Sequence, residues 1–67
     1  MHENHVYNLL LQQTEEHKSL WRIVNEYQKD AAGCLTCQAF WKKLAKDKEA
    51  HTAELHRLLK EHFAEST

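Results

Sequence analysis

The sequence contains no proline and a single glycine among its 67 residues. Proline interrupts helices, and glycine is the residue that most readily forms tight turns. A chain with so few of either has few positions at which a regular element must end. Together with the 28% of charged residues, these absences favour long helices in a soluble protein over a fold built from many short strands.

The chain also lacks an excess of charge of either sign and a long apolar run. Nine Lys and Arg residues are balanced by ten Asp and Glu residues, so neither a nucleic acid nor an anionic membrane is an expected partner. The longest uninterrupted apolar run is Leu9, Leu10 and Leu11, which is too short for a membrane span or a secretion signal. We therefore expect a cytoplasmic protein.

A chain of this length forms one small domain and buries only about 60% of the surface that its unfolded form exposes. Stability as a single copy is therefore doubtful. The six histidines are many for such a chain. Because histidine titrates near neutral pH and binds metals, their placement needs an explanation.

Apolar residues recur at helical spacing from about residue 4 to residue 30. Val6, Leu10, Leu20, Val24 and Tyr27 are expected on one side of the helix, with Leu9 and Ile23 beside them. The spacing predicts one long amphipathic helix. Three polar residues, Gln13, Glu16 and His17, fall inside its apolar sector.

The next residues, about 31–36, are predicted to form a turn. Gly33 is expected to take a left-handed conformation, and Thr36 is expected to cap the following helix with its hydroxyl. A second helix is predicted from residue 37 to about residue 64. Its apolar stripe contains Phe40, Trp41, Leu44, Leu55, Leu58 and Leu59.

A short turn forces two long helices to run antiparallel as a hairpin. Residues whose numbers add to about 67 should then face each other, which places His17 near His51 or Ala50 and His5 near His62. The apolar stripes are wider than one partner helix can cover. The predicted architecture is therefore an all-α hairpin, residues 1–67, that forms a homodimeric four-helix bundle.

The apolar stripe of the second helix is interrupted by Asp47, His51 and Glu54, whose spacings of four and three place them on one helix face. With Glu16 and His17 opposite, they form a predicted polar layer. Buried carboxylates and imidazoles must be paired or bound to a metal. The leading interpretation is an iron or zinc site made by these five residues. The alternative is a hydrogen-bonded layer that sets the register of a non-catalytic oligomerisation or adaptor module.

The segment DKEAHTAEL, residues 47–55, together with Glu16 resembles half of a ferritin-like bundle of the rubrerythrin type. In that family each half supplies a glutamate from one helix and Glu-x-x-His from the next, and the resemblance implies a metal site inside a four-helix bundle. Lys48 stands three residues before His51, where the family has glutamate. A site in this chain would therefore be a variant that uses His17, His51 and Glu54, with Glu16 or Asp47.

Cys34 and Cys37 form a CxxC motif at the turn. This spacing supplies half of a zinc site or a redox dithiol, and reduced cysteines that fill the turn are the third interpretation. In the zinc case the other two ligands would be His2, His5 or His62 of a second copy. The sequence shows no Gly-rich phosphate loop and no serine nucleophile constellation, so hydrolytic catalysis is not expected.

Overall fold

A computed structural model describes residues 2–66 of the chain and the side chains of residues 4–64. Within these residues all regular structure is helical, which confirms the predicted all-α class. The elements are α1 (His2–Arg22), the π-helical segment η1 (Ile23–Tyr27), α2 (Gln28–Asp30) and α3 (Leu35–Ser66). In this part of the chain no helix is long and apolar enough to cross a bilayer.

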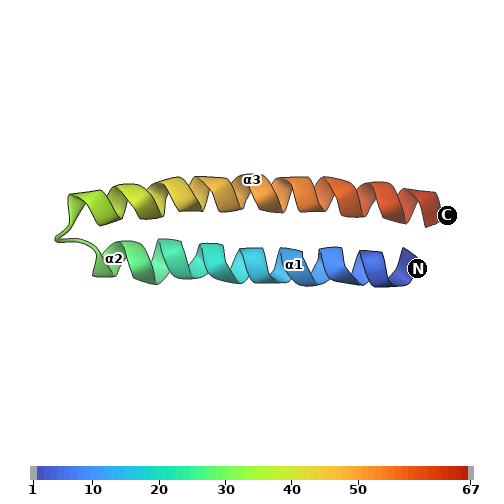
Figure 1. The fold of residues 1–67 in the computed structure, drawn as a ribbon, viewed down its shortest axis with the longest axis horizontal. Coiled ribbons are helices and arrows are strands. Elements are labelled where there is room, and N and C mark those ends of the chain that lie inside the picture. The colour runs from blue at the N-terminus through green and yellow to red at the C-terminus, as the bar shows by residue number, and fades with distance from the viewer. Residues whose placement is uncertain (1, 67) are drawn as a thin grey trace.

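The elements form two arms that lie side by side (Figure 1). The first arm is α1, η1 and α2 in succession, and the second arm is α3. The start of α1 and the end of α3 lie at the same end of the molecule, opposite the turn (Figure 1). The longest dimension is 51 Å, as expected for a helix of 32 residues that rises about 1.5 Å per residue.

Contacts between the arms follow the predicted register. The rings of His5 and His62 lie 5.0 Å apart in an edge-to-face arrangement, as predicted. Near the turn, Tyr27 lies against Trp41 with a centroid distance of 4.9 Å. Each of these pairs has residue numbers that add to 67 or 68, so the register holds along most of the length of the arms.

One row of residues on each arm faces the other arm. On the first arm these residues are spaced alternately by three and four, which keeps them on one helix face; they are Val6, Leu9, Gln13, Glu16, Leu20, Ile23 and Tyr27. On α3 the matching row is Trp41, Ala45, Lys48, Thr52, Leu55, Leu59 and His62. Among the described residues, the buried apolar side chains are Ile23, Ala45 and Leu59, and only Ile23 is fully buried. The core is therefore thin.

The π-helical segment is a feature that the sequence pattern does not predict. Its wider turn is closed by the backbone N–H of Gln28, which donates to the carbonyl of Ile23. The side-chain amide of Asn25 donates to the carbonyl of Trp21 at 2.9 Å and so competes with the backbone ladder at this point. Ile23, at the start of the segment, is 1% exposed.

The turn corrects two predictions. Gly33 has no positive φ. The first arm ends instead through hydrogen bonds from Ala31 N–H to the carbonyl of Tyr27 and from Ala32 N–H to that of Lys29, both 3.1 Å. The cap of α3 is Cys34 rather than Thr36. The carbonyl of Cys34 accepts the first helical hydrogen bond at 2.9 Å, so α3 begins two residues earlier than predicted.

Candidate functional site

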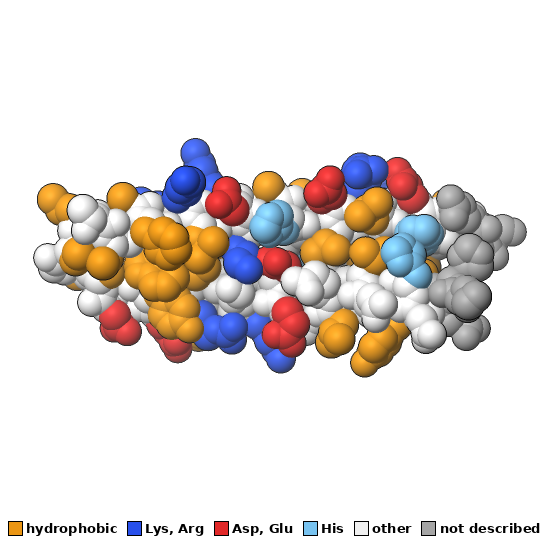
Figure 2. All heavy atoms as spheres, viewed as in Figure 1, with side chains coloured by type: hydrophobic (Ala, Val, Ile, Leu, Met, Phe, Trp, Pro, Cys, Tyr) orange, Lys and Arg blue, Asp and Glu red, His pale blue; other side chains and the backbone are white. Residues whose placement is uncertain are grey.

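The polar layer at mid-length is built around Glu16, the one buried charged residue among the described side chains. Glu16 lies in the inward row of α1 because it is three residues after Gln13 and four before Leu20. Figure 2 shows acidic, basic and histidine side chains meeting between the two arms at mid-length, whereas apolar side chains gather nearer the turn.

Three side chains surround the Glu16 carboxylate. Nζ of Lys48 lies 3.0 Å from Oε2 and Nδ1 of His51 lies 3.5 Å from Oε1. One turn earlier on α1, the amide of Gln12 donates to Oε1 at 3.2 Å. The buried carboxylate is therefore contacted by its own helix and by α3.

Two opposing effects act on the pKa of Glu16. Burial raises it, because burial disfavours the charged form. Hydrogen bonding to Lys48 and Gln12, together with the positive charge of Lys48 and of His51, lowers it by more. The net pKa lies below the ordinary value, so Glu16 is ionised at neutral pH and forms an ion pair with Lys48.

The structure brings together only some of the predicted metal ligands. Glu16 and His51 are in contact, and Glu54 lines the same hollow, which has a volume of about 190 Å³. Glu54 is exposed and lies 3.8 Å from Arg57. His17 and Asp47 are also exposed. The sequence predicts His17 opposite His51, but the structure places Glu16 in that position.

Within the described side chains, no three His, Cys, Asp or Glu residues are grouped closely enough to hold a metal ion. Lys48 explains part of this arrangement. Lys48 stands at the position where the ferritin-like resemblance implies a second carboxylate. Its ammonium group neutralises the carboxylate of Glu16 instead. The layer of a single copy is thus an ion pair with an adjoining imidazole.

The second cluster is at the turn, where Cys34 and Cys37 lie near each other without a disulfide bond. The backbone N–H of Cys37 donates to Sγ of Cys34 at 3.4 Å, and Sγ lies 3.3 Å from the hydroxyl of Thr36. The sequence identified both cysteines but placed the cap at Thr36. The side chain of His2, one of the histidines considered as a zinc ligand, lies outside the described side chains.

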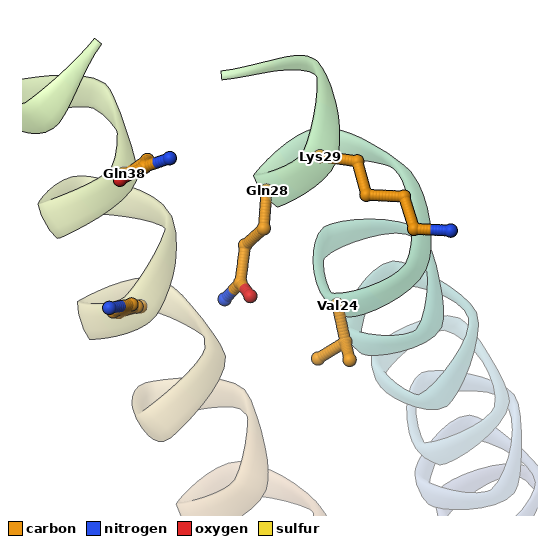
Figure 3. Close-up of a pocket in the computed structure, with 5 residues that line it drawn as sticks. Val24, Gln28, Lys29 and Gln38 are labelled. Carbon is orange, nitrogen blue, oxygen red and sulfur yellow. The ribbon is translucent and has the colours of Figure 1, made fainter. Parts of the chain in front are cut away.

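A third feature is a shallow hollow between the arms near the turn, with a volume of about 240 Å³. In Figure 3 the amide of Gln28 points toward the second arm, whereas the side chain of Lys29 points away from it. Val24, Gln38 and Lys42 complete the lining. These side chains include no carboxylate, imidazole, thiol or hydroxyl group, so we assign this hollow no chemistry.

A fourth feature is a second row of residues on the outer side of the first arm. All of its members are exposed and spaced alternately by three and four; they are Tyr7, Leu10, Thr14, His17, Trp21 and Val24. We call this row the outer seam. The sequence predicts an apolar sector wider than one partner helix can cover, but it does not identify Tyr7 and Thr14 as members of this row.

The comparisons with known proteins assign no family to this chain. No protein family, no curated protein and no solved structure matches it. The functional argument therefore rests on the residues themselves.

Proposed function

We propose that this chain is a small association module that forms a homodimer through the outer seam of its first arm. The observation that carries the proposal is the imbalance between core and surface. Three apolar side chains are buried among the described residues, and only that of Ile23 is fully buried, whereas eight large apolar side chains are exposed. Such a surface is costly in water, and a second copy of the chain is the occupant that the seam fits.

The outer seam has the spacing of a coiled-coil interface, in which alternating steps of three and four keep one stripe facing a partner helix. Its four large apolar side chains are between 42% and 62% exposed. The row is also symmetric about its centre. An antiparallel pairing of two α1 helices places Leu10 of one copy against Trp21 of the other, and Thr14 against His17.

Such a pairing is isologous, because the same surface serves both copies and the contact closes on itself. The dimer contains four helices, with the two α1 helices in contact at its centre. The Glu16–Lys48 ion pair would then set the register of the two arms within each copy, since sliding one arm by a turn leaves a buried carboxylate unpaired.

The test is the solution mass of the full chain by sedimentation equilibrium. We expect the mass of two chains for the wild type and the mass of one chain for Leu10→Glu and Trp21→Glu. Phe40→Glu is the matched control, because Phe40 is an exposed aromatic residue on the other arm. A wild type with the mass of one chain at 100 μM or more, or dissociation by the control alone, would refute the proposal.

Metal binding is the second candidate function, with iron or zinc as the ion. It is favoured by the contact of Glu16 with His51 and by Glu54 at the same hollow. One copy supplies too few ligands, so water or a second copy would complete the coordination. Lys48 would have to leave the carboxylate.

Elemental analysis of protein purified without added metal tests this candidate. We compare the wild type with His51→Ala and with His56→Ala, an exposed histidine that no described contact links to the Glu16 layer. A stoichiometric ion that is lost only in His51→Ala would support the metal site. Absence of metal from all three proteins, with the dimer intact, would leave the association module as the function.

A further inference from the structure

The two cysteines at the turn are held in different environments by the start of α3. Cys34 precedes the first residue of the helix, and its sulfur accepts the N–H of Cys37 at 3.4 Å. The sulfur therefore lies at the amino end of a helix of 32 residues, where the unpaired N–H groups and the helix dipole stabilise negative charge. Cys37 lies one turn further into the helix.

The hydrogen bonds divide the pair into an ionised and a protonated member. Hydrogen bonding from Thr36, and then from Cys37, lowers the pKa of Cys34 to about 7. The hydrogen bond with Cys34 and the negative charge of that sulfur raise the pKa of Cys37. At neutral pH a large fraction of Cys34 is thiolate while Cys37 keeps its proton.

Beside the cysteines is an open hollow of about 350 Å³ with a mostly apolar lining. Tyr27 and Trp41, whose rings lie 4.9 Å apart, form one part of it. Ala31, Asp30 and both cysteines form the rest. Asp30 and Tyr27 are its titratable side chains on the first arm.

We propose that Cys34 and Cys37 form a thiol–disulfide exchange site, in which the Cys34 sulfur attacks a disulfide of a peptide or protein whose apolar flank lies in this hollow. The proposal goes beyond the association module and is independent of it, because none of these residues belongs to the outer seam. Three observations together support the proposal. The Cys34 sulfur caps a helix, Cys37 lies one turn away, and an apolar hollow lies beside both cysteines.

The exchange needs no reactant other than the disulfide. The Cys34 thiolate forms a bond to one sulfur of the substrate, the substrate disulfide breaks, and the departing sulfur leaves as a thiolate that takes a proton from water. Cys37 then loses its proton to water and attacks the Cys34 sulfur, which releases the second substrate thiolate. Two electrons pass to the substrate, which is reduced, and the CxxC motif ends as a disulfide.

The test uses the reduced full chain and one equivalent of dithiodipyridine, an aromatic disulfide whose released thiol absorbs light. We expect the wild type to release two thiols per probe and to end two hydrogens lighter by mass spectrometry. Cys37→Ser should release one thiol and retain half of the probe. Cys34→Ser should react about tenfold more slowly at pH 7, because its remaining thiol, Cys37, is mostly protonated. The Cys37 thiolate is the stronger nucleophile, but its small fraction at this pH has the larger effect on the rate.

The role of the hollow is tested with two variants. Trp41→Ala removes an aromatic side chain from the lining, but it also removes the contact with Tyr27. Ala31→Glu places a charge at the hollow and leaves that contact intact. We expect both variants to react at least about threefold more slowly with the aromatic disulfide. Phe63→Ala is the matched control, an exposed aromatic residue far along α3, and should react as the wild type does. Circular dichroism identifies variants that remain helical.

Three outcomes would overturn the proposal. The first is an equal rate for Cys34→Ser and Cys37→Ser, because the structure then assigns no attacking sulfur. The second is protection of all thiols by zinc at one ion per two chains, which would make the cysteines metal ligands. The third is an unchanged rate in both hollow variants that remain helical, because the apolar hollow then has no part in the exchange.

Discussion

Nζ of Lys48 lies 3.0 Å from Oε2 of Glu16, and this ion pair joins the two arms at mid-length. Both side chains lie in the inward rows, and Glu16 is the more buried of the two. A single buried carboxylate is costly unless a cation accompanies it. Lys48 supplies that cation at the position where the ferritin-like resemblance implies a second carboxylate.

Replacing Lys48 alone should therefore lower the stability of the fold more than replacing both Lys48 and Glu16. We expect Lys48→Met to lower the free energy of unfolding by about 2 kcal/mol, because it leaves the Glu16 carboxylate without its cation. The double variant Glu16→Leu with Lys48→Met should recover most of this loss. Urea denaturation followed by circular dichroism, at one protein concentration, measures both. Additive losses in the double variant would show that the two side chains do not interact.

The ion pair also predicts how stability depends on pH. The folded-state pKa of Glu16 is lowered below 4.5, so the unfolded state binds the proton more readily. The stabilisation is present above about pH 4.5 and is lost as the pH falls through the folded-state pKa. The melting temperature should drop in this range, and Glu16→Gln should flatten the profile. An identical acid dependence in the variant would assign the effect to other carboxylates.

The hydroxyl of Thr36 is predicted to control the reactivity of Cys34. We would measure the rate at which iodoacetamide alkylates Cys34 in Cys37→Ser as a function of pH. The midpoint of this profile should lie below the ordinary pKa of a thiol, because the Thr36 hydroxyl and the N–H of residue 37 still contact the sulfur. Thr36→Val should move the midpoint upward, and Thr36→Ser should restore it. If Thr36→Val leaves the midpoint unchanged, the hydroxyl has no part in stabilising the thiolate.

Gly33 offers a test of the turn. It has no positive φ, and a Cβ added to it would meet no atom within 4 Å. Alanine at this position should raise the free energy of unfolding by about 0.4–1 kcal/mol, since it restricts the unfolded chain without straining the folded one. Thermal denaturation of Gly33→Ala measures this. A loss of stability would mean that the turn needs a conformation that alanine resists.

Much of the fold follows from local sequence pattern. The absence of proline and the regular spacing of apolar residues predicted two long helices, and the short turn predicted the contact of His5 with His62. The candidate site was predicted less well. Glu16 and His51 were both identified, but His17 was placed in the layer together with them. The metal interpretation of the layer stays a prediction.

The reason lies in the width of the apolar sector. Glu16 and His17 are neighbours about 100° apart on the helix, and both fall within a sector that is too wide for one partner. Which of them turns inward depends on what α3 presents, and α3 presents Lys48. The same reasoning applies at the turn, where the cap of α3 depends on which carbonyl accepts the first helical hydrogen bond.

The sequence by itself determined that the chain is helical, where it turns and which residues lie near mid-length, because helical periodicity and turn chemistry act over a few neighbouring residues. Only the tertiary structure decided that Glu16 is buried against Lys48, that His17 belongs to the outer seam and that the Cys34 sulfur caps α3. These outcomes depend on contacts between the arms and on the phase with which each helix begins. A one-residue shift in that phase turns a side chain by about 100°, which exchanges an inward position for an outward one.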